Sequence, residues 1–287
     1  MTEIGSNLNL EDSSDPLVSI CVQTYQQEEF ISQCLDSLLA QKCNFLFEIV
    51  LGEDDSTDRT RKICQEYAKK HPDIIRLFLR DKKDKIFIRG QKTGRSNFLA
   101  NLKAAKGKYI TLCDGDDYWI NDQKLQLQVD FMEKHPEVGL TYSSLLQESS
   151  DHNEKKISAQ DQIHTAEELK KEHFLGHGST WIFRNDLDEL FANPIIYKSP
   201  FLDVVIFYYF KMRSKIASQS FTSSFYRFNT AGIYQIKNKR QRHSDLLYMQ
   251  YCFYRYFHHD LAFFLRSGIF YHAKKYLQTF IKDSHGT

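Results

Sequence analysis

Short apolar runs alternate with helix-like patterns through the first half of this chain. The predicted strands, rich in aliphatic and aromatic residues, cover 17–22, 45–51, 74–79, 109–113 and 138–142. The predicted helices, in which apolar residues recur at helical spacing, cover 31–39, 59–70, 97–106 and 124–135. Gly107 is expected to close the third helix as its C-cap. This alternation favours a mostly parallel α/β sheet with right-handed crossovers.

Polar residues follow three of the predicted strands, around Thr24, Asp54 and Asp114. In parallel α/β sheets, ligands bind beyond the carboxyl ends of the strands. The three clusters therefore predict a binding site at one edge of the sheet. Residues 147–162 are polar and lack aromatic side chains, which predicts a surface loop at which a domain boundary could be drawn.

The densest polar cluster is the acidic turn after the strand at 109–113. The turn from Asp114 to Asp117 holds three carboxylates and one glycine. Carboxylates this close raise one another's pKa unless a cation or a set of N–H donors compensates them. Their oxygens are hard ligands that suit Mg²⁺ or Mn²⁺, often together with substrate phosphates. The alternative is an acidic turn in which Asp117 or Asn121 caps the following helix.

Composition narrows the class of protein. The 287 residues suffice for one large α/β domain, and the formal charge of +1 gives no global field that would favour nucleic acid. Lysines and arginines gather at 82–85 and 237–242, and we interpret both clusters as solvated loops. The six cysteines are scattered without a C-x-x-C pair, which favours buried thiols in a reduced cytosolic protein over a disulfide framework or a zinc site.

The N-terminal 15 residues are polar and acidic and do not resemble a signal peptide, so we expect a disordered tail. No apolar run approaches the roughly 18 residues that a membrane-spanning helix needs. We therefore expect a cytoplasmic protein, either free in solution or at the inner face of the membrane.

With these motifs in order, the chain resembles family 2 glycosyltransferases of the GT-A fold. The matching segments are 16–25, 48–60 and 107–117, with looser matches at 178–184, 201–203 and 226–229. The resemblance implies an α/β fold with a Rossmann-like, mostly parallel central sheet flanked by helices. It also implies a catalytic domain at 16–235, with a nucleotide-sugar-binding half at 16–142 and an acceptor half at 143–235. Residues 236–287 would form a helical C-terminal extension.

The resemblance also assigns roles to individual residues. The donor nucleotide would contact residues at the strand ends and in the basic segment that follows them: Thr24, Tyr25, Glu53, Asp54, Arg95, Asp114 and Gly115. Asp114 and Asp116 would hold Mn²⁺ or Mg²⁺ on the diphosphate of the donor. A cation there suits the chemistry, because the leaving nucleoside diphosphate gains negative charge in the transition state.

Asp203 stands where inverting members of the family place the base that deprotonates the acceptor hydroxyl. It precedes the apolar aromatic run 204–210, and desolvation beside such a surface would raise its pKa, as suits a general base. The alternative is that Asp203 caps a helix. Ser179, Thr180 and Trp181 match the acceptor side.

Three positions depart from the family pattern. Asn229 stands where many members carry a histidine that completes the metal site, which leaves the third protein ligand open. Asp55 replaces a common glycine. Ser96 replaces a common arginine, whose role would pass to Arg95. His177 beside the acceptor motif is treated as a loop residue and not as a metal ligand.

From residue 240 onward the chain is rich in aromatic residues and histidine and predicts two or three amphipathic helices. They would pack against the catalytic domain or against a second copy of the chain. The competing interpretation is a peripheral membrane face for residues 240–287, where aromatic and lysine side chains would meet a bilayer that carries a lipid-linked acceptor.

The resulting prediction is a metal-dependent, inverting glycosyltransferase. It would move a sugar from a nucleotide-diphosphate donor, with UDP as the default, to a hydroxyl of a glycan or lipid-linked saccharide in surface polysaccharide assembly. Two alternatives remain. One is a nucleotidyltransferase, although residues 23–29 lack the glycine-rich phosphate loop expected after its first strand. The other is a non-catalytic nucleotide- or glycan-binding module with a degenerate site.

Overall fold

The structure is a computed structural model that describes residues 15–165, 168–169, 175–229, 232, 237–257 and 273–276. Its centre is a ten-stranded sheet in the order β10-β12-β8-β11-β6-β1-β2-β3, with β7 paired to β12 and β9 paired to β8. The strands are β1 Val18–Thr24, β2 Phe47–Glu53, β3 Ile75–Leu79, β6 Tyr109–Asp114, β7 Tyr118–Trp119, β8 Val138–Glu148, β9 Glu154–Ile157, β10 Gln162–Ile163, β11 Ile182–Arg184 and β12 Lys215–Tyr226. A separate hairpin consists of β4 Phe87–Ile88 and β5 Gln91–Lys92.

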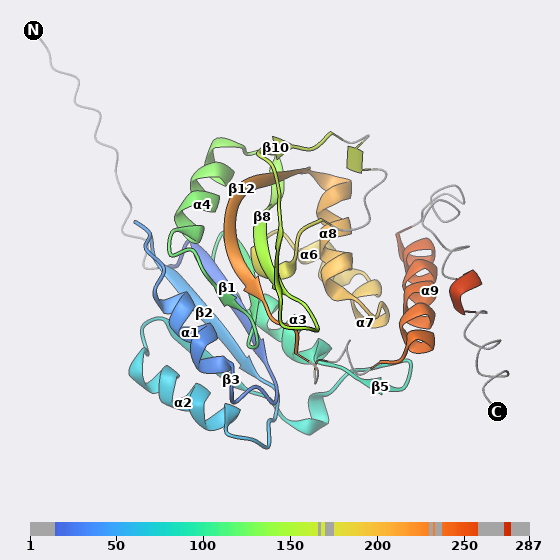
Figure 1. The fold of residues 1–287 in the computed structure, drawn as a ribbon, viewed down its shortest axis with the longest axis horizontal. Helices are drawn as coiled ribbons and strands as arrows, with labels where there is room; N and C mark the ends of the chain where they lie inside the picture. Colours follow the sequence, from blue (N-terminus) through green and yellow to red (C-terminus); the bar gives the residue numbers. More distant parts are fainter. Residues whose placement is uncertain are drawn as a thin grey trace, which may run out of the picture.

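The parallel part of the sheet is β6-β1-β2-β3, as the alternating pattern predicted. The second half of the chain adds β11, which runs antiparallel to both β6 and β8, and β12, which runs parallel to β8. The result is a mixed α/β fold with a curled central sheet flanked by helices (Figure 1).

Helices cover both faces of this sheet (Figure 1). They are α1 Ile31–Leu39, α2 Thr60–Lys70, α3 Arg95–Ala104, α4 Lys124–Lys134, α6 Asp188–Ala192, α7 Ile195–Lys198, α8 Leu202–Arg213 and α9 Lys239–Tyr256, with 3-10 turns η1 Lys82–Asp84 and η2 Gly178–Thr180. Alternate residues of a strand point to opposite faces. Accordingly Ile20 and Val22 of β1 pack in the core formed with α1, α2 and α4, whereas Cys21 packs in the core that includes α3, α8 and α9.

Two local predictions are wrong. Gly107 does not cap α3, which ends at Ala104 with Ala105 as its C-cap. A Cβ on Gly107 would lie 2.6 Å from the backbone nitrogen of Ser19, so glycine is needed there for close approach to β1. Residues 147–162 are mostly exposed as predicted, but they are not a loop throughout, because they include the end of β8, all of β9 and the first residue of β10. The proposed line between the two halves, at 142–143, falls inside β8.

The described part of the C-terminal segment is α9 and a helical turn at 273–276; the remaining predicted helical residues lie outside the described residues. Asn238 begins α9 with a capping box, in which its side chain accepts from the backbone of Gln241. Cys252 and Phe253 of α9 are buried in the core that includes α3 and α8, and the Phe253 ring meets Tyr208 of α8 edge-on at 4.9 Å. No helix among the described residues is long and apolar enough to cross a membrane.

Five of the six cysteines are buried and Cys43 is partly exposed; all six are free thiols. The prediction of unpaired, mostly buried thiols is therefore confirmed.

Candidate active site

The three polar clusters predicted from the sequence lie together at the carboxyl edge of the parallel strands. Gln23 of β1 is in register with Gly52 on one side and Asp114 on the other. The carbonyl of Thr24 accepts a hydrogen bond of 3.0 Å from the amide of Asp54. The carbonyl of Gln23 accepts one of 2.9 Å from the amide of Gly115. The end of β1 thus ties the Asp54 turn to the acidic turn.

Gly115 allows the acidic turn to lie directly on β1. A Cβ at this position would lie 2.5 Å from Oε1 of Gln27 and 2.8 Å from Cβ of Thr24. The hydroxyl of Thr24, itself buried, donates to the same Gln27 oxygen at 2.8 Å. Thr24 and Gly115 therefore fix the shape of this edge, and any larger residue at 115 would push the carboxylates away from β1.

Asp114 stands at the end of β6 with its side chain exposed. Restricted hydration, followed by repulsion from Asp116 and Asp203, raises the pKa of its carboxyl to about 7. Because the side chain is exposed, solvent weakens the first effect, and we give more weight to the repulsion. A cation placed among these carboxylates would relieve that repulsion.

Asp117 is the buried member of the triplet. One of its carboxylate oxygens accepts from the amide of Arg227 at 3.1 Å, whereas Oδ2 is buried without a hydrogen-bond partner. Nδ1 of His177 lies 3.9 Å from that oxygen. Burial lowers the pKa of His177 to about 4, so the imidazole is neutral, and burial followed by Asp116 raises the pKa of Asp117. The site therefore holds one carboxylate that the protein does not fully compensate.

The alternative that Asp117 or Asn121 caps the next helix is wrong. The N-cap of α4 is Gln123, whose own side chain makes no capping hydrogen bond. The side chain of Gln41 instead accepts from the amide of Leu125 in the first turn, at 3.1 Å. Asn121 accepts from the amide of Gln123 at 2.9 Å, which shapes the preceding turn.

Arg227, at the end of β12, holds the acidic turn in place. Its guanidinium donates to the carbonyl of Asp116 at 2.7 Å and to the side chain of Gln33. The same group lies 4.7 Å from the ring centre of Tyr118 and 5.0 Å from that of Phe30. The sequence placed Arg227 in the loosely matching segment 226–229, but it did not show that its guanidinium holds the acidic turn.

Asp54 marks the other end of the site. Its side chain is only 6% exposed and forms an ion pair with Lys85, whose side chain is 2% exposed. Lys85 also donates to the carbonyl of Asp54 at 2.7 Å. Burial raises the pKa of Asp54, although Lys85 opposes this shift. Tyr25, which is 41% exposed, presents its ring 5.4 Å from the amine of Lys85 and 5.1 Å from that of Lys92.

The interpretation of 82–85 as a wholly solvated cluster is therefore wrong at Lys85. The sequence shows a basic loop, but it does not show that the loop folds back across Asp54. Lys85 and Lys92 are site residues that the sequence analysis missed.

Two predicted donor contacts have other partners. Glu53 has no exposed side-chain surface, because its oxygens accept from the amide of Ser56 at 2.7 Å and from Arg61. Arg95 is buried, and its guanidinium donates to the carbonyls of Ile196 and, at 2.8 Å, Ser199. Both side chains are engaged within the protein, and donor contact by either of them stays a prediction.

The predicted acceptor residues Ser179, Thr180 and Trp181 are buried as well. The carbonyl of Ser179 accepts from the indole of Trp119 at 3.0 Å, and the indole of Trp181 donates to the carbonyl of Leu175 at 3.0 Å. Acceptor contact by these buried side chains stays a prediction. His177, the N-cap of η2, keeps 28% of its side chain exposed.

Asp203 lies at the start of α8, close enough to Asp114 and to Arg95 to influence the pKa of each. The prediction that it caps this helix is wrong, since the N-cap is Phe201 and Asp203 is the second helical residue. Its carboxylate accepts from the amide of Val204 at 2.9 Å. Burial raises its pKa, and Val204 and Arg95 oppose the shift.

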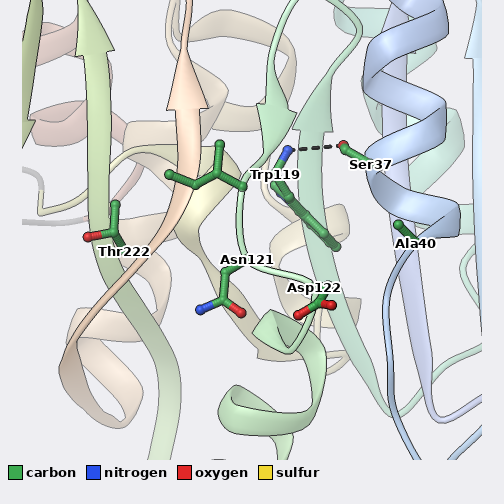
Figure 2. A pocket seen from close by; sticks show the side chains of 7 residues that line it. Ser37, Ala40, Trp119, Asn121, Asp122 and Thr222 are labelled. Carbon is green, nitrogen blue, oxygen red and sulfur yellow. Dashed lines mark hydrogen bonds between the residues drawn. The ribbon is translucent and has the colours of Figure 1, made fainter.

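One surface hollow lies beside β7 and is not lined by the acids of the turn at 114–117. It measures about 550 Å³ and is lined by Ser37, Ala40, Trp119, Ile120, Asn121, Asp122 and Thr222. Figure 2 shows these side chains around the end of β7, where the amide of Trp119 donates to the hydroxyl of Ser37 at 3.0 Å. Within the described residues, no three His, Cys, Asp or Glu side chains converge on a point that could hold a metal ion.

The profile of Glycosyl transferase family 2 matches residues 19–191, which include the Asp54 turn, the acidic turn and η2. The chain belongs to glycosyl transferase family 2. Within that family it is 30% identical over 156 residues to the putative teichuronic acid biosynthesis glycosyltransferase TuaG of Bacillus subtilis, covering 54% of this chain and 58% of TuaG. The chain spans about a third, 34%, of the length of the first curated relatives that it matches.

Solved glycosyltransferases share the fold. The mannosyltransferase PcManGT of Pyrobaculum calidifontis, in complex with GDP-Man and Mn²⁺, matches with a TM-score of 0.60 at 15% identity over 95% of this chain and 76% of that chain. Residues 1–349 of TarS from S. aureus, in complex with UDP-GlcNAc, match with a TM-score of 0.56 at 18% identity over 83% of this chain and 67% of that chain. The GT-A fold expected from the sequence is therefore confirmed.

Proposed function

We propose that this chain is a metal-dependent, inverting glycosyltransferase that moves a sugar from a nucleoside-diphosphate donor to a hydroxyl of a saccharide acceptor. The observation that carries the proposal is the gathering of Asp54, Asp114, Asp116 and Asp203 around the carboxyl edge of one sheet. Asp54 would contact the nucleobase, and the acidic turn would contact the diphosphate through the metal ion. Asp203 would accept the proton of the acceptor hydroxyl. Membership of glycosyl transferase family 2, together with this arrangement, favours catalysis of sugar transfer over a non-catalytic binding module.

The pair formed by Asp54 and Lys85 favours a particular class of nucleobase. A carboxylate accepts from a ring N–H, and an amine donates to a neighbouring carbonyl. Uracil and guanine present an N–H beside a C=O, whereas adenine and cytosine present no ring N–H at that edge. Tyr25 offers an exposed ring on which such a base could stack. We therefore propose UDP as the donor nucleotide, with GDP as the second candidate.

The donor groups at the acidic turn fit Mn²⁺ or Mg²⁺. Asp114 and Asp116 are the proposed ligands, and the carboxylate of Asp116 is already held by the side-chain amide of Asn229 at 2.9 Å. Turned over, that amide would present its oxygen, which also suits these ions. A bound divalent ion would offset the negative charge that develops on the leaving diphosphate. Since the protein supplies few ligands, the diphosphate itself would complete the coordination.

Asp203 is the proposed general base. Its carboxylate would take the proton of the acceptor hydroxyl while the oxygen forms a bond to the anomeric carbon and the bond from that carbon to the diphosphate breaks. Attack on the face opposite the leaving group inverts the anomeric centre. The raised pKa of Asp203 strengthens it as a proton acceptor, and Arg95 holds the segment that precedes it.

The acceptor is proposed to be a glycan or lipid-linked saccharide in surface polysaccharide assembly. The name of TuaG, a relative that matches over half of this chain, supports this class. The proposed acceptor half is residues 143–235, where His177 rather than the buried Ser179 presents its side chain.

Thermal melting with a panel of nucleoside diphosphates tests the proposal. Ligands that bind the native state raise the melting temperature. UDP or GDP with Mn²⁺ should raise the melting temperature of the wild type, ADP and CDP should not, and Asp116→Asn should lose the metal-dependent part. A rise with ADP or CDP alone would contradict the base assignment. No rise with any nucleotide would favour a binding module for glycans.

A further inference from the structure

The β4–β5 hairpin joins the donor end of the site to the C-terminal helix. Lys85 precedes the hairpin and Lys92 ends β5; Lys85 lies against Asp54 and Tyr25, and Lys92 lies against Tyr25. Its tip points the other way, to α9, which it meets across more than 150 residues of sequence. In Figure 1 the segment labelled β5 extends toward α9.

The tip is held by a dense set of contacts to α9. The guanidinium of Arg89 donates to Oδ1 of Asp245 at 2.9 Å and to the hydroxyl of Ser244 at 2.7 Å. It also lies 5.1 Å from the ring centre of Tyr248. The second oxygen of Asp245 accepts from Lys237 at 2.6 Å. With its side chain 8% exposed, Asp245 is a buried carboxylate that is paired on both oxygens.

The tip is a two-residue turn with positive φ at both residues. Arg89 has φ of 54° and Gly90 has φ of 77°, both in the left-handed region. For a residue with a Cβ this conformation is unfavourable and persists where the surroundings enforce it. A two-stranded hairpin is marginally stable by itself. Its other anchors are Ile88, which is buried, and the bonds from Thr93 to the carbonyl of Ile86 at 2.7 and 3.2 Å.

We propose that Arg89, paired with Asp245, is a positioning residue for the donor nucleotide: the pair holds the hairpin so that Lys85 and Lys92 lie beside Asp54 and Tyr25 before the nucleotide binds. The inference rests on the proposed function, because it assumes that this end of the site takes a nucleoside diphosphate. Lysine side chains lose considerable rotamer freedom on binding, and a scaffold that orders them beforehand increases affinity. The C-terminal helix thereby contributes to donor affinity without touching the donor.

Arg89→Ala in the full chain tests the proposal, and Arg76→Ala is its matched control. The ion pair of Arg76 with Glu48 measures 2.6 Å, and the two side chains are 35% and 7% exposed. The ion pair of Arg89 with Asp245 measures 2.9 Å, and the two side chains are 35% and 8% exposed. Arg76 also lies over an aromatic ring, that of Phe78 at 5.4 Å. Glu48 is at the opposite end of β2 from Asp54. The two variants thus remove equivalent arginines, and only one of them holds the hairpin.

The measurement is the dissociation constant of UDP with Mn²⁺, by isothermal titration calorimetry, together with the melting temperature of each variant. Arg89→Ala should weaken UDP binding by about fivefold, a size typical of coupling through a packed network. Arg76→Ala should lower the melting temperature and leave the dissociation constant within about twofold.

A double-mutant cycle shows whether Arg89 acts through the lysines. In a chain that already carries Lys85→Met and Lys92→Met, adding Arg89→Ala should weaken UDP binding no further. An undiminished effect in that background, or wild-type affinity in Arg89→Ala alone, overturns the positioning role while leaving the proposed function intact. If the wild type binds neither UDP nor GDP, the proposed function fails and this inference fails with it.

Discussion

The side-chain amide of Asn229 donates a 2.9 Å hydrogen bond to the carboxylate of Asp116, 113 positions earlier in the chain. The resemblance to the family implies a histidine at this position, where it would complete a metal site. In this chain, a neutral amide stands beside the proposed metal ligand. It orients the Asp116 carboxylate, and its carbonyl oxygen remains the weaker of the two possible ligands for a hard cation.

Asn229→Ala should therefore weaken metal-dependent donor binding. Loss of a group that orients a metal ligand typically lowers affinity by about tenfold or more. Titration of UDP into the variant with and without Mn²⁺ measures the effect, and only the titration with Mn²⁺ should change. Asn153→Ala is the control, since Asn153 donates to Asp151 at 2.6 Å in an exposed turn of the β8–β9 hairpin. Equal effects of the two substitutions would contradict a special role for Asn229.

Arg227→Ala should loosen the acidic turn. The variant loses the bond to the Asp116 carbonyl and the stacking between Phe30 and Tyr118. UDP binding in Mn²⁺ should fall by about tenfold, since a hydrogen bond from a charged group contributes about 1.5 to 3 kcal/mol. Arg227→Lys, which keeps the charge but lacks the planar fork, should recover only part of the affinity. Full recovery would show that charge alone matters.

Asp203→Asn should lower the transfer rate by about 10² to 10⁴, the usual contribution of a general base. The dissociation constant of UDP should stay near that of the wild type, because Asp203 faces the acceptor step. Since burial raises the pKa of Asp203 and the base must be ionised, the wild-type rate should climb with pH through a range above the ordinary value for aspartate. A pH–rate profile measures this. An acid limb that survives unchanged in the asparagine variant would assign it to another group.

Lys124 offers a test of stability against pH. Its amine is fully buried between Thr111, Gln128 and the ring of Trp119, and burial lowers its pKa from 10.5 to about 7. Between these values the unfolded chain binds more protons than the folded one, so the contribution of Lys124 to stability rises with pH. Lys124→Met abolishes this titration.

The free energy of unfolding of the wild type minus that of Lys124→Met should therefore increase from pH 7 to pH 9, by at most about 1.4 kcal/mol per pH unit. Urea denaturation at several pH values provides the measurement. Parallel curves for the two proteins would mean that the buried amine stays charged in the folded state.

Local features of the fold were predictable because they depend on neighbours in sequence. The helix at 31–39 has the predicted bounds, since Cys34, Leu35 and Leu38 form one buried stripe. The strand ending in Asp114 shows five buried residues before an exposed acid, as its pattern indicated. The prediction for Gly107 was wrong because a glycine that follows a helix suggests a C-cap, whereas this glycine lets its backbone approach that of Ser19 closely.

Partners far apart in the chain were not predictable in this way. In the sequence Lys85 belongs to a basic cluster that suggests a solvated loop, and only the fold shows its ion pair with Asp54. Likewise, nothing in the sequence around Arg89 indicates its pairing with Asp245. The candidate catalytic residues were found in motifs that directly follow strands. The residues that hold them in place, such as Arg227 after β12, lie far away in the sequence. Ser179 and Thr180 matched a motif, but the sequence did not show that both side chains are buried.

The most direct test of the central claim is release of nucleoside diphosphate from a panel of sugar donors, including UDP-Glc, UDP-GlcNAc and GDP-Man, with Mn²⁺ and a saccharide acceptor mixture. The wild type should release UDP or GDP from at least one donor, and Asp116→Asn and Asp203→Asn should each lower the rate of release by about a hundredfold or more. A wild type that binds a nucleoside diphosphate tightly but releases none from any donor, or variants that turn over like the wild type, would contradict the account.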